Sequence, residues 1–177
     1  MSPDFTQNHF ELFALPESYE LDVPALERAY RSLLREVHPD RFAGTSDAEK
    51  RLAAQWATRA NEGYRTLKSP LNRGRYFLRI NGVDTEEESN TAMPLEFLTQ
   101  QMEWREAVVE AKSRGDSDQL DALALQRSNE EKLMFDLLRQ QLSASATLMA
   151  ARETVRKLRF LEKLGEEIDD ALEALAA

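Results

Sequence analysis

The residues whose side chains are best suited to chemistry are His38 and Asp40, which flank Pro39. An imidazole and a carboxylate are the groups used in general acid–base catalysis and in metal binding. Both uses require further polar side chains that converge on one pocket. The chain holds only two histidines and no cysteine, which excludes thiol catalysis, disulfides and thiolate ligation of zinc or of an iron–sulfur cluster. We therefore expect no cofactor, no metal site and no enzymatic activity, and an acid–base enzyme stays the alternative interpretation.

Three arginines precede this tripeptide on one side of a predicted helix. At 100° per residue, Arg28, Arg31 and Arg35 fall within about 60° of one another. No acidic side chain is expected to neutralise this stripe, and Arg41 extends it beyond the tripeptide. The pattern indicates either an ordinary solvated face or a docking face for an acidic partner. The opposite, apolar face of the same helix consists of Leu26, Tyr30, Leu33 and Val37.

A helical hairpin is predicted to position the tripeptide. Asp22 is a suitable N-cap for a first helix from Val23 to Val37. Ser46 and Glu49 form the pattern of a capping box for a second long helix. A shorter helix follows from Pro70 to Ile80. The second helix is predicted to bury one face, which consists of Leu52, Trp56, Ala60, Tyr64 and Leu67.

The second half of the chain has a different organisation. We predict an acidic linker at residues 84–93, which separates an N-terminal domain (1–83) from a C-terminal domain (94–177). Gly115 is a good C-cap between two long helical segments. Antiparallel helices joined by short loops predict a three-helix bundle. The helical segments of this bundle are expected at about residues 94–114, 116–142 and 144–175.

The composition supports an all-α fold and narrows the expected partners. Only six glycines and six prolines are present, too few for the tight turns of a sandwich or barrel. The net charge is −9, so nucleic acid is not an expected partner. No apolar stretch has the length of a membrane span, and the N-terminus has no basic and apolar leader. We therefore expect a cytoplasmic protein that does not contact membranes.

The tripeptide and its flanking helices resemble the J-domain family. The match consists of a helix, the His-Pro-Asp loop, and a second helix with the pattern Asn61, Tyr64 and Leu67. A proline turn with a capping aspartate is the structural alternative. The resemblance implies that the first helix and the loop contact the ATPase domain of a DnaK-class chaperone. The chaperone-binding residues would be Arg28, Arg31, Arg35, His38, Pro39, Asp40 and Arg41.

The architecture of the whole chain resembles the HscB family, whose partners are the chaperone HscA and the iron–sulfur scaffold IscU. General J-proteins carry a Gly/Phe-rich segment or Cys-rich modules, and this chain carries neither. The resemblance implies an L-shaped protein, with a J-domain packed against the three-helix bundle. It also implies a co-chaperone that stimulates an HscA-like ATPase and delivers an IscU-like scaffold, which aids cluster assembly and transfer. A J-protein for a different client is the alternative. The segments that carry the match are residues 10–16, 97–106 and 155–164.

Two apolar stripes run along the helix that begins near Pro94. The first contains Phe97, Trp104, Val108 and Ala111, and the second contains Leu95, Leu98, Met102 and Val109. A wide core face is the commoner explanation of the second stripe, and a binding patch is the alternative.

Phe160 lies off the apolar stripe of the last helix, among charged neighbours. We predict that Phe160, Leu98 and Met102 are exposed and close together. Thr99 stands where the resemblance implies a larger apolar residue. The resemblance assigns scaffold binding to Leu98, Met102, Glu103, Glu106 and Phe160.

Overall fold

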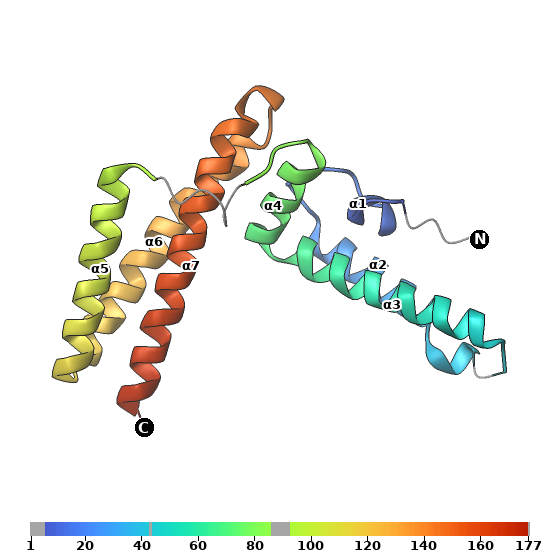
Figure 1. The fold of residues 1–177 in the computed structure, drawn as a ribbon, viewed down its shortest axis with the longest axis horizontal. Helices are drawn as coiled ribbons and strands as arrows, with labels where there is room; N and C mark the ends of the chain where they lie inside the picture. The colour runs from blue at the N-terminus through green and yellow to red at the C-terminus, as the bar shows by residue number, and fades with distance from the viewer. Residues whose placement is uncertain (1–5, 43, 86–92, 177) are drawn as a thin grey trace. The chain divides into compact units, whose positions relative to one another are not determined.

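The computed structural model describes residues 6–42, 44–85 and 93–176, and every regular element within these ranges is helical (Figure 1). This confirms the predicted all-α fold. No helix among the described residues is long and apolar enough to cross a membrane. The α-helices are α1 (His9–Leu12), α2 (Val23–Glu36), α3 (Asp47–Lys68), α4 (Pro70–Ile80), α5 (Leu95–Arg114), α6 (Ser117–Gln141) and α7 (Leu148–Ala176), and two 3₁₀ turns cover Pro39–Phe42 and Ser145–Thr147.

The described residues divide into two compact units, and the boundary between them in the sequence follows Ile80. The first unit contains α1 to α4 and the second contains α5 to α7. Residues 86–92 of the predicted linker lie outside the described residues. The domain limits drawn from the sequence, and the L-shaped arrangement of the two domains, therefore stay predictions.

The helix ends of the N-terminal unit form where the sequence places their caps. The Asp22 carboxylate accepts a hydrogen bond from the Ala25 backbone N–H at 3.0 Å. Ser46 and Glu49 make the reciprocal bonds of a capping box at the start of α3. Both caps satisfy backbone donors that the first helical turn leaves without a partner.

The α2–α3 hairpin is joined by the residues of the Asn-x-x-Tyr-x-x-Leu pattern. The Tyr30 hydroxyl donates to the Asn61 side-chain oxygen at 2.7 Å. The rings of Tyr30 and Tyr64 stack with their centroids 4.1 Å apart. Leu67 is fully buried. The pattern is therefore a structural device that holds α2 against α3.

The short helix α1 is attached through His9, which is buried. Its backbone N–H donates to the Tyr76 hydroxyl at 2.8 Å, and its ring stacks on the Tyr76 ring at 4.4 Å. Burial lowers the pKa of His9 from its ordinary value of 6.5, since the charged form loses hydration. Gly63 of α3 permits His9 and Phe13 to lie close to this helix, because a Cβ at this position would lie 3.2 Å from the His9 ring and 3.1 Å from Phe13.

Arg73 of α4 joins two other segments of the same unit. Its guanidinium donates to the backbone oxygens of Tyr19 at 2.8 Å and of Leu67 at 2.5 Å. It also lies over the Tyr19 ring, 5.0 Å from the centroid. Desolvation lowers the pKa of this buried arginine. One side chain thus ties the α1–α2 connection to the end of α3.

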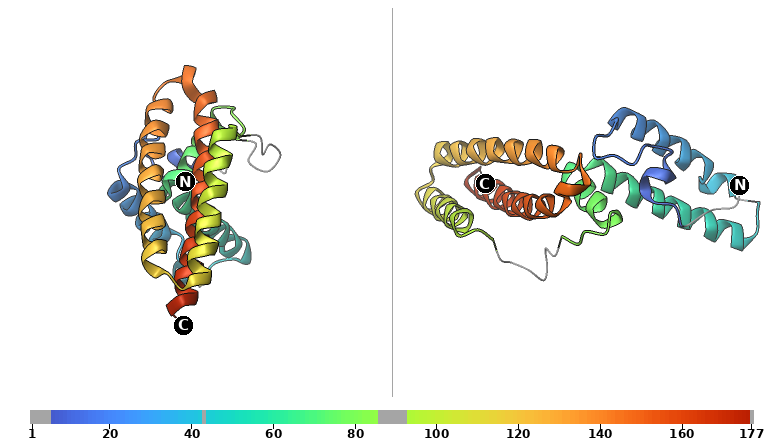
Figure 2. Two further views of the ribbon diagram at one scale, coloured as in Figure 1. Left: turned by 90° about the vertical axis from the view of Figure 1, so that its left-hand side faces the viewer. Right: turned by 90° about the horizontal axis from the view of Figure 1, so that it is seen from above.

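The C-terminal unit is a three-helix bundle in which α5 and α7 run parallel and α6 runs antiparallel to both (Figure 2). Gly115 ends α5 with a positive φ of 68°, as its position as a C-cap predicts. The Arg105 guanidinium of α5 contacts the Glu167 carboxylate of α7 at 3.0 Å. The bundle core consists of Trp104, Val108, Ala111, Leu120, Leu123, Leu161, Leu164, Ile168 and Ala171.

Candidate functional site

The His-Pro-Asp loop is held by hydrogen bonds within a 3₁₀ turn. The Arg41 backbone N–H donates to the His38 carbonyl oxygen at 3.0 Å. The Asp40 backbone N–H donates to the His38 Nδ1 atom at 3.3 Å, and the Asp40 carboxylate lies 3.6 Å from the same nitrogen. The side chains stay 58% and 92% exposed. The turn therefore presents both functional groups to solvent.

This exposure bears on the acid–base alternative. Catalytic pairs act in clefts where water is excluded and further polar groups converge. His38 and Asp40 instead expose 58% and 92% of their side chains to solvent. Across the described ranges, no three or more His, Asp or Glu side chains are grouped as a metal site requires. The loop geometry favours contact with another macromolecule.

The arginine stripe lies on the solvent side of α2, next to this loop. The prediction that nothing neutralises it is wrong. Arg28 pairs with Asp22 at 3.9 Å, and Arg31 pairs with Glu27 at 3.4 Å, because the N-cap and the preceding helical turn carry acids. Such exposed pairs contribute only about 0–1 kcal/mol.

The arginines of these pairs remain available to a partner. Their side chains are 71% exposed for Arg28 and 74% exposed for Arg31. The Arg41 guanidinium donates to the Arg35 carbonyl oxygen at 3.5 Å, which joins the loop to the stripe. The structure thus brings all the predicted chaperone-binding positions onto α2 and the turn that follows it.

The two apolar stripes of α5 have different surroundings. Phe97, Trp104, Val108 and Ala111 are buried in the bundle. On the second stripe, Leu98 is half-buried and three residues are exposed. The wide core face is therefore the wrong explanation of the second stripe. Its exposed members are Leu95 (78%), Met102 (62%) and Val109 (69%).

Leu95 and Val109 enlarge the predicted patch. Together with the half-buried Leu98 and the exposed Met102 they form one apolar strip, which we call the α5 patch. The sequence contains this stripe, but the predicted site includes only its two central members. The signal that identifies the outer two is the same helical spacing.

Phe160 is half-buried, as is Leu98, so the prediction that these side chains are exposed is wrong for both residues, whereas Met102 is exposed as predicted. Its ring packs edge-on against Phe97, with centroids 5.8 Å apart and an interplanar angle of 82°. Arg156, one of its expected charged neighbours, is buried. The contact places Phe160 beside the turn of α5 that carries Leu98. Met102 follows one turn later and is clearly exposed.

The two acidic residues predicted at the edge of the α5 patch lie at different angular distances from it. Glu103 and Glu106 are both exposed. At 100° per residue, Glu106 lies about 40° from Met102, whereas Glu103 lies about 100° from it. The exposed Thr99 donates its hydroxyl to the Leu95 carbonyl oxygen at 3.0 Å and adds little apolar surface. Glu106 is therefore the acid that borders the patch most closely.

Known proteins resemble this chain in sequence and in fold. A family model described as the HSCB C-terminal oligomerisation domain matches residues 93–169. The co-chaperone protein HscB homolog of Azoarcus sp. (strain BH72) is 50% identical over 175 residues, which are 99% of each chain. The structure of chaperone HscB from Vibrio cholerae is 34% identical, with a TM-score of 0.84 over 96% of this chain and 99% of that one. Human co-chaperone protein HscB is 28% identical, with a TM-score of 0.90 over 100% of this chain and 87% of that one.

Proposed function

Because this chain belongs to the HscB family of co-chaperones, we propose that it stimulates the ATPase of an HscA-like chaperone and delivers an IscU-like scaffold to it. It would thereby aid the assembly and transfer of iron–sulfur clusters. The observation that carries the proposal is that each compact unit has its own exposed contact surface: the His-Pro-Asp loop on the J-domain and the α5 patch on the bundle.

The chaperone is proposed to bind α2 and the loop. The arginine stripe attracts an acidic surface and accelerates the encounter, since long-range charge acts mainly on association rates. His38 and Asp40 then contact the chaperone at positions that the 3₁₀ turn fixes. ATP hydrolysis takes place on the chaperone, and this chain contributes contacts rather than catalytic groups.

The scaffold is proposed to bind the α5 patch together with Phe160. Met102 supplies a flexible and polarisable side chain that adapts to an irregular partner surface. Phe160 supplies a large rigid ring beside Leu98, and Glu106 offers a charged contact at the edge. A chain that holds both partners raises the effective concentration of the scaffold at the chaperone.

The chaperone half is tested by the variant His38→Gln. The loop imidazole is exposed and contributes little to packing, so the melting temperature should stay unchanged. Stimulation of the ATPase of an HscA-like chaperone should be lost. Normal stimulation at saturating co-chaperone would contradict the proposed role of the loop.

The stripe is tested by the double variant Arg31→Glu and Arg35→Glu. Binding to the chaperone should weaken, while scaffold binding stays unchanged. The wild-type interaction should also weaken as salt rises, because exposed charges are screened over about 10 Å at 0.1 M. Binding that does not depend on salt would make the stripe an ordinary solvated face.

The scaffold half is tested by truncating Leu98, Met102 and Phe160 to alanine together. Full burial of such a side chain is worth roughly 1.5–3 kcal/mol, and the half-buried Leu98 and Phe160 gain less than the exposed Met102, so affinity for an IscU-like scaffold should fall roughly tenfold or more. The control truncates three other exposed side chains of the bundle, Leu125, Leu133 and Met149.

The control variant should bind the scaffold as the wild type does. Equal losses in both variants would show a general dependence on surface apolarity instead of a specific patch. A wild-type chain that captures a different client but no IscU-like scaffold would favour the alternative J-protein function.

A further inference from the structure

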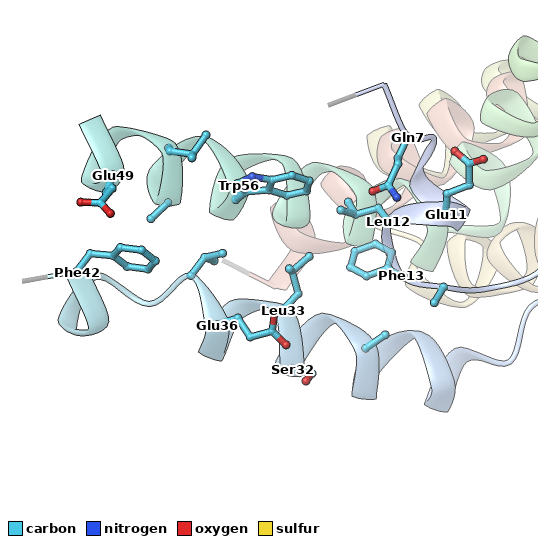
Figure 3. A pocket seen from close by; sticks show the side chains of 15 residues that line it. Gln7, Glu11, Leu12, Phe13, Ser32, Leu33, Glu36, Phe42, Glu49 and Trp56 are labelled. Carbon is cyan, nitrogen blue, oxygen red and sulfur yellow. The ribbon is translucent and has the colours of Figure 1, made fainter. Parts of the chain in front are cut away.

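An open groove of about 730 Å³ runs between α2 and α3 in the J-domain (Figure 3). Figure 3 shows Trp56 of α3 and Leu33 of α2 on opposite walls, with Phe42 at one end and Glu11 at the other. We call this feature the hairpin groove. Its apolar lining includes Phe13, Leu33, Val37, Phe42, Leu52 and Trp56.

The groove exists because α1 is too short to cover the hairpin. This helix has four residues, and it buries Phe10 and Phe13 against the half of the hairpin nearer α4. Beyond it, Leu52 and Trp56 stay half-buried. The sequence predicts that both belong to the buried face of α3, together with Tyr64, which is also half-buried, so the prediction is wrong for these three residues. The hairpin thus continues past α1 as an apolar surface with no covering element among the described residues.

The charged residues that line the groove are all acidic. They are Glu11, Glu36 and Glu49, and no Lys, Arg or His among the described residues lines it. Hydrogen bonds from Ser46 lower the pKa of the Glu49 carboxyl, which therefore stays ionised. Glu11 accepts the Asn8 backbone N–H at 2.7 Å in the capping box of α1. Glu36 serves no cap and lies on the flank of α2 next to the arginine stripe.

We propose that the hairpin groove docks an amphipathic helical segment of a partner protein, with leucine-like anchors at i and i+4 and Lys or Arg residues at its flanks. The apolar walls fit the anchors, and the acidic rim fits the cationic flanks. The wall that α3 forms from Glu49 to Trp56 is about 10 Å long, at a rise of 1.5 Å per residue. This length would accommodate about two turns of a docked helix. The arginine stripe would repel such a segment, so the two flanks of α2 select partners of opposite charge.

The probe is a synthetic helical peptide of twelve residues with leucines at i, i+4 and lysines at both ends, matched by a peptide with glutamates in place of the lysines. Trp56 reports occupancy through its fluorescence in the full-length variant Trp104→Phe, which removes the other tryptophan. The lysine peptide should shift the Trp56 emission to shorter wavelength, and the glutamate peptide should bind roughly tenfold or more weakly. Equal binding of both peptides, or no change in Trp56 emission, would overturn the proposal.

Two groove variants sharpen the test. Glu36→Arg should weaken the lysine peptide roughly tenfold, because one attraction becomes a repulsion, whereas the charge-matched Glu173→Arg on the bundle should not. Ser32→Phe places a large ring in the groove and should abolish the Trp56 response without lowering the melting temperature.

The α5 patch is also apolar with an acidic edge and is the main competing site. Peptide binding that survives Ser32→Phe but is lost with Met102→Ala would place the peptide there and overturn the proposal. Concentration-dependent self-association that Ser32→Phe removes would assign the groove to a second copy of this chain and would likewise overturn it.

Discussion

The two units of this chain hold their helices together by different kinds of contact. In the J-domain, directional contacts join several of the elements, such as the Tyr30–Asn61 hydrogen bond, the stack of His9 on Tyr76 and the carbonyl contacts of Arg73. In the bundle, layers of Leu, Val and Ile side chains fill the core, and the Arg105–Glu167 pair lies at its edge.

Helix length explains this difference. The bundle helices have 20, 25 and 29 residues and present continuous apolar stripes that bury large areas. Helices α1 and α4 have only 4 and 11 residues, so they bury less aliphatic surface and depend on specific partners. The directional contacts of the J-domain fix the geometry of the His-Pro-Asp loop, whereas the bundle provides a rigid support for the α5 patch.

The largest expected effect comes from a core leucine of the bundle. Leu161 is fully buried, so Leu161→Ala should destabilise the bundle by about 2–5 kcal/mol. Urea unfolding followed by Trp104 fluorescence, in a Trp56→Phe background, measures this loss. Leu133→Ala is the control, because Leu133 is 63% exposed and its truncation should change stability very little. A small loss at Leu161 would mean that the aliphatic layers are not the main source of stability.

The second effect has the opposite sign and concerns Gln101, one of the buried polar side chains of the bundle. Gln101 is 1% exposed, and neither side-chain amide atom has a hydrogen-bond partner among the described residues. A buried amide without partners costs about 1–3 kcal/mol, so Gln101→Met should raise the stability of the bundle. The exposed Gln126→Met is the matched control. A lower melting temperature for Gln101→Met would show that the amide makes a hydrogen bond, for example to a buried water.

A smaller loss is expected from the J-domain hairpin. Tyr30→Phe keeps the ring stack on Tyr64 and removes the hydrogen bond to Asn61, which should cost about 0.5–1.5 kcal/mol. Unfolding followed by Trp56 fluorescence, in a Trp104→Phe background, measures it. Tyr64→Phe is the control, because its hydroxyl accepts from the solvent-exposed Lys68 at 2.9 Å and donates to Glu27 only at 3.5 Å, so its loss should cost less. Equal losses would show that the Tyr30–Asn61 hydrogen bond contributes no more than the contacts of the Tyr64 hydroxyl.

The last and smallest expected effect is a dependence of J-domain stability on pH. Burial lowers the pKa of His9 in the folded state, with Arg59 and Arg79 acting in the same direction and Glu62 opposing them. The unfolded chain therefore binds the proton first, and stability should fall as the pH drops below 6.5 toward the folded pKa. Urea unfolding between pH 7.5 and pH 5.5 tests this.

The two histidines of the chain provide the matched comparison. His9→Gln should flatten the pH dependence of J-domain unfolding, because its side chain no longer titrates. His38→Gln should preserve it, since His38 lies in an exposed loop. A dependence that survives His9→Gln would assign the effect to the carboxylates.

The sequence alone determined where most helices begin and end. The caps at Asp22, Ser46 and Gly115 form as their residue types predict, because each cap depends on a few neighbouring backbone groups. The buried stripe of α7 also follows from its 3.6-residue period, with Leu158, Leu164 and Ile168 among its buried members. These features are local, so no knowledge of the tertiary contacts is needed to predict them.

Only the tertiary structure decided which side of each helix is covered. The two apolar stripes of α5 look alike in the sequence, yet one is buried against α6 and α7 and the other is exposed. Phe160 sits among charged residues in the sequence, yet it packs on Phe97. Trp56 fits a buried stripe, yet it lines an open groove because α1 ends too early to cover it. A helical period gives the direction of a side chain from its own axis, whereas burial depends on where the neighbouring helices lie, and that is set by contacts between residues far apart in the chain.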